Sequence, residues 1–150
     1  MPKIAIVTDS TSDLPKEIAK QYNITIVPLN VHFGDETLLD GIDINSKQFF
    51  HKLVESEYHP QTSQPSVGTF IKTYETLLKN YDNILSIHIS SKLSATYNSA
   101  LQASNELSSS TKNITVLDSL TGTVALGAIV TKIAKMNKEN VSMENLIQES

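Results

Sequence analysis

The sequence contains no cysteine, which excludes disulfides, thiolate metal sites, thiol nucleophiles and CxxC redox motifs. It also lacks an excess of basic charge, because 12 basic residues stand against 16 acidic ones and the net charge is −4. A nucleic-acid-binding protein would carry a basic stripe, so we expect no nucleic-acid partner. No apolar run approaches the roughly 18–20 residues of a membrane span. The run at residues 4–7 is too short for a signal-peptide core, so we expect a cytoplasmic protein without stable membrane insertion.

Glycine is scarce, with only five in the chain, and the glycine-rich nucleotide motifs are missing. Gly122 and Gly127 have P-loop spacing, but Ala128 and Ile129 follow where that motif needs Lys and Ser or Thr. The dinucleotide fingerprint G-x-G-x-x-G, the zinc motif H-E-x-x-H and the nucleophile elbow G-x-S-x-G are also absent. The sequence therefore predicts no metal site and no cofactor.

Strand patterns alternate with helix patterns along the chain. The short apolar, β-branched run at residues 4–7 is typical of a strand covered on both faces, and further strands are predicted at residues 24–29, 84–89 and 114–117. We therefore predict an α/β fold in one domain over residues 1–150, with an open, mostly parallel sheet and helices on both faces. A small β-hairpin turning at Gly34 is predicted between residues 31–33 and 37–39.

The helices are predicted from their caps and apolar faces. Asp13, Asn45, Ser66 and Ser142 are expected N-caps, and Gln48 completes a capping box with Asn45. Residues 124–133 are apolar nearly all round, which predicts a helix enclosed between neighbours. Pro28 is expected to end a strand, and the two prolines in residues 59–65 predict a loop without regular structure.

Hydroxyl side chains are abundant and clustered, at residues 10–12, 62–63, 90–91 and 108–111. Ligands in open α/β sheets bind beyond the carboxyl ends of the strands. The segments 62–66 and 90–94 each place hydroxyls at the start of a predicted helix, where the helix dipole favours a carboxylate or phosphate. Ordinary helix capping explains the same pattern. A serine triad could be assembled from Ser94, Asp118 and a histidine, although His88, inside a strand, is typical of a core histidine.

Several motifs occur in one order over nearly the whole chain. They are I-V-T-D-S-T-S-D-L-P (6–15), I-T-I-V-P-L (24–29), D-G-I-D-I (40–44), T-S-Q-P-S (62–66), S-S-K-L-S-A-T-Y (90–97) and L-D-S (117–119), with the later Gly127. This set resembles the DegV family of bacterial fatty-acid-binding proteins, which includes the FakB-type subunits of fatty acid kinase. The one departure is Ala95, where the family usually has glycine.

The resemblance implies a lipid carrier and not an enzyme. In the family, two α/β domains enclose one long-chain fatty acid and present it to a partner kinase subunit, which phosphorylates the carboxylate. The carboxylate-binding hydroxyls correspond here to Thr62 and Ser94, with Ser63, Ser91 and Ser119 as neighbours.

Family members are roughly twice as long as this chain. The resemblance therefore implies the first domain alone, which holds half of the site and lacks the second, tunnel-forming domain. An apolar face left uncovered in this way could drive self-association.

Two alternatives remain open from the residues themselves. One is a serine-dependent hydrolase or transferase that uses Ser94 with a histidine. The other is a regulatory domain that binds only protein, through the hairpin around Asp35 or an exposed apolar face.

Overall fold

The computed structural model describes residues 2–107 and 113–150, so the hydroxyl cluster at residues 108–111 lies outside the described residues. The elements in chain order are β1 (Ile4–Asp9), the 3-10 turn η1 (Ser10–Ser12), α1 (Lys16–Gln21), β2 (Ile24–Val27), β3 (Asn30–Phe33), β4 (Glu36–Leu39), α2 (Ser46–Glu55), β5 (Gln61–Ser63), α3 (Val67–Leu77), β6 (Asn83–His88), α4 (Thr96–Leu107), β7 (Asn113–Asp118), α5 (Thr123–Lys138) and α6 (Met143–Gln148).

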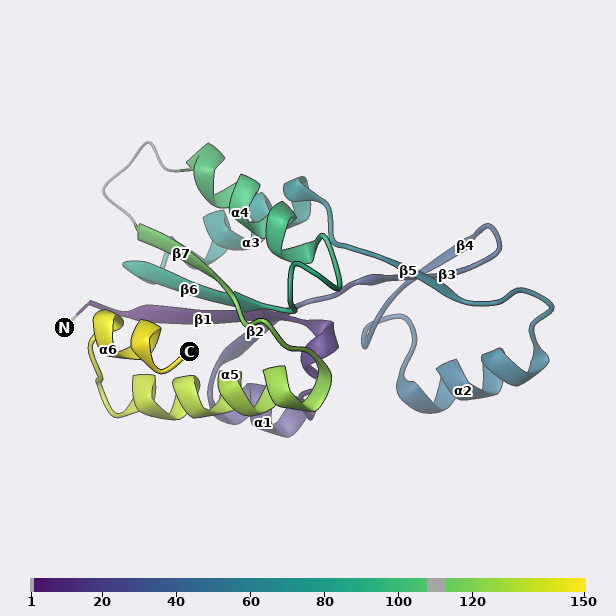
Figure 1. The fold of residues 1–150 in the computed structure, drawn as a ribbon, viewed down its shortest axis with the longest axis horizontal. Coiled ribbons are helices and arrows are strands. Elements are labelled where there is room, and N and C mark those ends of the chain that lie inside the picture. Colours follow the sequence, from purple (N-terminus) through teal and green to yellow (C-terminus); the bar gives the residue numbers. More distant parts are fainter. Residues whose placement is uncertain (1, 108–112) are drawn as a thin grey trace.

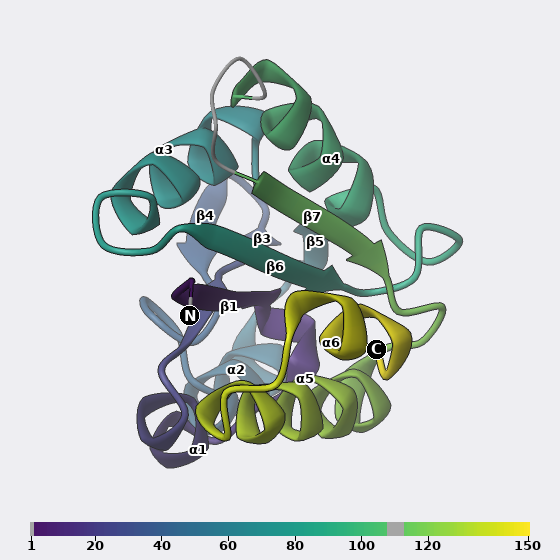
Figure 2. The same ribbon diagram turned by 90° about the vertical axis from the view of Figure 1, so that its left-hand side faces the viewer.

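The main sheet has four parallel strands in the order β2-β1-β6-β7. Every residue of β1 is buried, as expected for a strand that is covered on both faces. Helices α3 and α4 lie on one face, and α1, α5 and α6 lie on the other (Figures 1 and 2). The predicted α/β fold with a parallel sheet is therefore confirmed.

Each face of the sheet has its own core. Phe70 and Tyr74 of α3 pack on one face, and Leu126 and Val130 of α5 pack on the other. Helix α5 is not enclosed on all sides, since its outer face is open to solvent and Val124 is 75% exposed. The prediction of an enclosed helix is wrong here, because an apolar composition does not itself supply a second packing partner.

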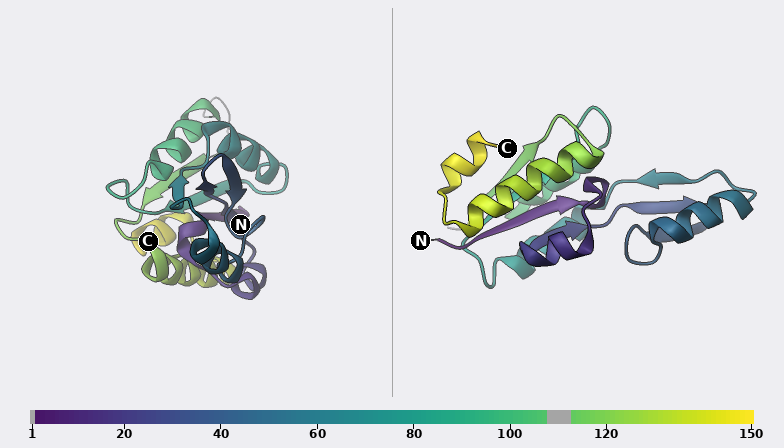
Figure 3. Two further views of the ribbon diagram at one scale, coloured as in Figure 1. Left: turned by 90° about the vertical axis from the view of Figure 1, so that its right-hand side faces the viewer. Right: turned by 90° about the horizontal axis from the view of Figure 1, so that it is seen from below.

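A three-stranded antiparallel sheet in the order β4-β3-β5, with α2 beside it, projects beyond the carboxyl ends of the parallel strands (Figure 1; Figure 3, right). We call residues 30–63 the arm. It has a small core of its own around Val31, Phe33 and Ile44. The predicted hairpin is confirmed as β3 and β4, and Pro28 does end the preceding strand.

Two local predictions are wrong. Residues 61–63 form strand β5 instead of a loop, because Pro60 and Pro65 flank these three residues and leave their N–H groups free to pair with β3. Asp13 does not cap α1, whose N-cap is Pro15. Asp13 instead ends η1 with a φ of +50°, and Asp9 caps that turn by accepting a hydrogen bond from the backbone N–H of Thr11. The predicted caps of α2, α3 and α6 are confirmed.

Candidate functional site

The loops after β6 and β7 are tied together at the carboxyl edge of the main sheet. The backbone N–H of Ser91 donates to Asp118 Oδ2 at 3.2 Å, and that of Ser119 donates to the carbonyl of His88 at 3.0 Å. The N–H of Ser90 also donates to the carbonyl of Thr121 at 2.8 Å. Ser91 and Ser119, both predicted site neighbours, therefore belong to one joined surface.

Ser94 stands at the end of the turn that leads into α4. Its backbone N–H donates to the carbonyl of Ser90 at 3.1 Å, which closes the turn. Its hydroxyl accepts from the N–H of Thr96 at 3.2 Å and lies 2.9 Å from the hydroxyl of Thr96. Ser94 therefore belongs to the turn directly before α4, where its hydroxyl binds the first residue of the helix. When the Thr96 hydroxyl donates to Ser94, the Ser94 O–H is free to donate to a ligand.

Thr62 lies in the middle of β5, opposite Val31, and is exposed. Ser63 is turned to the other face of β5, where its hydroxyl lies 2.8 Å from His32 Nε2 and 3.2 Å from Asn30 Nδ2. Ser63 is thus engaged within the arm. Among the described residues no hydrogen bond joins Thr62 to Ser94, which lie on the arm and on the main sheet respectively.

The loop after β7 has a strained backbone. Leu120 and Thr123 both have positive φ, at 55° and 51°, and this conformation is especially unfavourable for the β-branched Thr123. Asp118 holds the loop by accepting from the N–H of Leu120 at 2.9 Å. Leu120 is 73% exposed, and Leu93, which lies against Gly122 of the same loop, is 70% exposed. An apolar rim therefore borders the hydroxyls of the edge.

Asp118 remains a carboxylate in this loop. Burial raises its pKa, but hydrogen bonds from Ser91 and Leu120 and the charge of Lys92 together hold the pKa below its ordinary value.

The sequence reasoning missed a buried polar network below this edge. His88 Nδ1 lies 2.8 Å from Asp9 Oδ2, and His88 Nε2 lies 2.7 Å from the hydroxyl of Ser86. The hydroxyl of Tyr74 donates to Ser86 at 2.9 Å. All four side chains are fully buried. The signal was present in the sequence, since Ser86 and His88 stand two apart on one strand and so share a face.

The network has the connectivity of a catalytic triad, but its serine is unreachable. Ser86 has no exposed surface, so no substrate can approach it. Ser94, the predicted alternative nucleophile, makes no hydrogen bond to a histidine in the part of the chain that the structure describes. His88 is therefore a satisfied core histidine, as its position in a strand indicated.

The Asp9 carboxylate is ionised within this network. Burial raises its pKa, but the hydrogen bond and charge of His88 and the hydrogen bonds from Thr11 and Ile89 lower the pKa further than burial raises it. A lowered pKa means that Asp9 stabilises the fold at neutral pH and loses this contribution as the pH falls below the ordinary carboxyl range. Burial also raises the pKa of Tyr74, which keeps its hydroxyl a donor.

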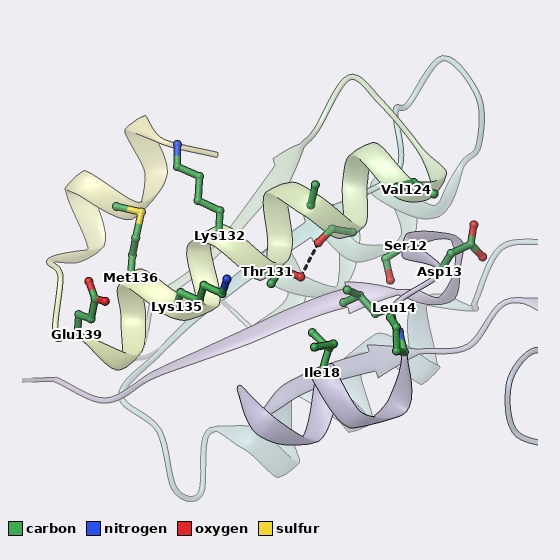
Figure 4. A pocket seen from close by; sticks show the side chains of 13 residues that line it. Ser12, Asp13, Leu14, Ile18, Val124, Thr131, Lys132, Lys135, Met136 and Glu139 are labelled. Carbon is green, nitrogen blue, oxygen red and sulfur yellow. Dashed lines mark hydrogen bonds between the residues drawn. The ribbon is translucent and has the colours of Figure 1, made fainter.

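A groove of about 580 Å³ runs between α1 and α5 (Figure 4). Its walls are mainly apolar and include Leu14, Ile18 and Met136. Ser12, at its end, has a buried hydroxyl without a hydrogen-bond partner among the residues that the structure describes. The groove does not include Thr62 or Ser94.

The described residues contain no group of three or more His, Asp or Glu side chains that could hold a metal ion. Across residues 2–107 and 113–150, no helix has both the length and the apolar character needed to cross a bilayer.

The chain is similar to bacterial proteins of one family. A DegV domain-containing protein of Clostridium perfringens is 40% identical over 149 residues, which cover 99% of this chain and 53% of that protein. A DegV domain-containing 15.5 kDa protein of Staphylococcus aureus is 43% identical over 136 residues, which cover 91% of this chain and 94% of that protein. The first of these relatives is thus about twice as long as the matched segment, whereas the second is similar in length.

The fold is also shared with a solved structure. DegV of Bacillus subtilis, described as a fatty acid binding protein, matches with a TM-score of 0.93 and 36% identity over 99% of this chain and 52% of that chain. The model of the DegV family, a family described as uncharacterised, matches residues 3–150. The chain therefore belongs to the DegV family.

Proposed function

We propose that this chain binds the carboxylate end of a long-chain fatty acid, with Thr62 and Ser94 as hydroxyl donors. The observation that carries the proposal is the likeness to DegV of Bacillus subtilis, a fatty acid binding protein whose fold this chain shares over 99% of its length. Ser94 supports it further, because its hydroxyl can donate to a ligand when the Thr96 hydroxyl donates to Ser94.

The residues at the edge suit a fatty acid better than a strongly charged ligand. The sequence has no arginine, so a bidentate guanidinium clamp cannot come from this chain. Neutral hydroxyls and a helix N-terminus hold a carboxylate less tightly and leave it reactive towards a phosphoryl donor. Each buried CH₂ of a fatty acid contributes about 0.8 kcal/mol. The acyl tail of the ligand therefore supplies most of the affinity, and the hydroxyls of the protein set the orientation of the carboxylate.

The wider role that we propose is that of a cytoplasmic carrier. The bound acid is presented to a fatty acid kinase catalytic subunit, which transfers phosphate from ATP to the carboxylate and forms an acyl phosphate. The carrier itself contributes no catalytic residue. Ser63, Ser91 and Ser119 are proposed neighbours of the carboxylate, and no metal or cofactor is required.

This chain spans about half the length of the first relatives that it matches. We propose that it supplies one side of the binding site. Leu93, Leu120 and Val124 are each at least 70% exposed at the carboxyl edge. Such a surface favours association with another apolar surface, including that of a second copy.

The binding test is calorimetric titration of the chain with oleate below its micelle concentration. We expect saturable binding of oleate by the wild-type chain. Thr62→Val and Ser94→Ala should each weaken this binding about tenfold, which corresponds to the loss of one hydrogen bond to a charged group. Ser56→Ala is the matched control, because Ser56 also accepts a backbone N–H in a turn, at 3.1 Å from Tyr58, but directly follows α2 and is none of the proposed site residues. No uptake by the wild-type chain, or equal losses in all three variants, would contradict the proposal.

A further inference from the structure

The carboxylate of Asp9 joins two loops at the edge of the sheet. Oδ1 accepts from the backbone N–H of Thr11 at 3.0 Å and from the hydroxyl of the same residue. Oδ2 accepts from His88 Nδ1 at 2.8 Å and from the backbone N–H of Ile89 at 3.1 Å. A fully buried carboxylate is costly unless donors surround it, so these contacts hold both loops to the end of β1.

The contact with Ile89 controls the turn that carries Ser94. Ile89 directly precedes Ser90, and the carbonyl of Ser90 accepts from the N–H groups of Leu93 and Ser94 at 2.9 and 3.1 Å. The hydroxyl of Ser90 accepts from the N–H of Lys92 at 3.3 Å. The whole turn is therefore built on Ser90, one residue beyond the point where Asp9 fixes the backbone.

The neighbouring Ser10 fixes the other side of the proposed site. Its hydroxyl accepts from the backbone N–H of Leu29 at 3.0 Å. Leu29 is buried and leads directly into β3, where Asn30 pairs with Ser63 of β5. The Asn30 side chain also donates to Ser63 at 3.2 Å, so the root of the arm is held beside the strand that carries Thr62.

We propose that Asp9 and Ser10 are positioning residues that set Thr62 and Ser94 relative to each other. Asp9 places the turn with Ser94, and Ser10 places the arm with Thr62. Neither touches the fatty acid in this scheme. The inference rests on the proposed function, because it says that Asp9 and Ser10 connect the two sides of that proposed site. Asp9 ends β1 and Ser10 begins η1, so two consecutive residues hold both sides, which lowers the entropy lost when a ligand bridges them.

The test uses the chain with the substitutions Asp9→Asn and Ser10→Ala and two readouts, amide hydrogen exchange and oleate affinity. Asp9→Asn keeps the shape but replaces an acceptor by a donor, so we expect exchange at residues 89–94 to accelerate at least tenfold more than exchange of Leu85 in the core of β6. Ser10→Ala should accelerate exchange at Leu29 in the same way, and Ser10→Thr should restore it because the acceptor returns. We expect both Asp9→Asn and Ser10→Ala to weaken oleate binding about tenfold while the chain stays folded.

The matched control is Asp82→Asn, because Asp82 accepts a backbone N–H from Lys3 at 2.7 Å at the opposite end of the sheet. It should change neither readout at the carboxyl edge. If the Asp9 variant does not fold, Ser10→Ala decides the matter, since it removes one acceptor from a half-buried site. The inference would be overturned if exchange accelerated uniformly at all amides. It would also be overturned if the wild-type chain binds oleate and the Asp9→Asn and Ser10→Ala variants bind it with unchanged affinity. If the wild-type chain takes up no oleate, the proposed function fails, whereas the exchange pattern still decides whether Asp9 and Ser10 position the two segments.

Discussion

The hydroxyl of Ser86 joins two buried groups, and its removal is the sharpest test of the network in the core. In Ser86→Ala, the Tyr74 hydroxyl loses its acceptor at 2.9 Å and His88 Nε2 loses its partner at 2.7 Å. Both groups are fully buried, so water cannot replace Ser86 without a shift in packing. Each unsatisfied group costs about 1–3 kcal/mol, so the free energy of unfolding should fall by about 4 kcal/mol.

Tyr74→Phe removes only the outer member of the same chain. Ser86 keeps its bond to His88, and the loss is one neutral hydrogen bond of about 1 kcal/mol. In the double variant, His88 Nε2 alone remains unsatisfied. The double variant should therefore lose only about 2 kcal/mol, which is about 3 kcal/mol less than the sum of the two single effects.

The assay is urea unfolding at pH 7, followed by far-ultraviolet circular dichroism. Ser12→Ala is the matched control, because Ser12 is a buried serine whose hydroxyl has no partner within residues 2–107 and 113–150. Its removal relieves an unpaired polar group, so the stability should stay unchanged or rise by up to about 1 kcal/mol. The reasoning is refuted if Ser86→Ala costs no more than Ser12→Ala or Tyr74→Phe, or if the two single effects simply add.

Two further predictions concern packing and charge. Gly127→Ala should lower the free energy of unfolding by about 2 kcal/mol in the same assay, because a Cβ there would lie 2.4 Å from the backbone oxygen of Ser12. Gly68→Ala is the control, because a Cβ there would lie 3.8 Å from its nearest neighbour, the hydroxyl oxygen of Ser66, and it should stabilise α3 by about 0.5–1 kcal/mol. Destabilisation by both variants would count against a close approach of η1 to α5. Burial and the charge of Asp40 raise the pKa of Asp13, so its ionisation above the ordinary carboxyl pKa of 3.8 costs stability. Asp13→Asn should therefore stabilise by about 0.5 kcal/mol at pH 7, and a gain that persists at pH 3 would exclude this electrostatic cause.

Part of the local structure was readable because it depends on neighbours in the chain. The capping box of Asn45 and Gln48 forms within four residues, and both of its hydrogen bonds are 2.9 Å. The buried strands were equally clear, since an all-apolar β-branched run is stable only when both faces are covered. Asp13 shows where such reasoning fails. The turn η1 precedes α1, so Asp13 ends that turn and Pro15 takes the N-cap position of α1. Asp9, which caps η1, also binds His88, which lies 79 residues away.

The proposed site shows the same division. The sequence motifs pointed to Thr62 and Ser94, and the family membership that they indicated is confirmed. The roles of the two hydroxyls stay predictions. Local patterns could not predict that Thr62 lies on an arm projecting from the sheet edge. The arm forms because β3 pairs with β5, which is about thirty residues away in the sequence.

The sequence by itself determined the family, the alternation of strands and helices and the absence of thiol, P-loop and zinc-motif chemistry. These follow from residue identity and from periodicities that span a few neighbours. Only the tertiary structure decided that Asp9, Ser86 and His88 form one buried network and that Asp9 and Ser10 hold two separate loops. The physical reason is that a buried carboxylate takes its donors from whichever segments the parallel sheet brings beside it, and that choice is made by strand order and not by distance along the chain.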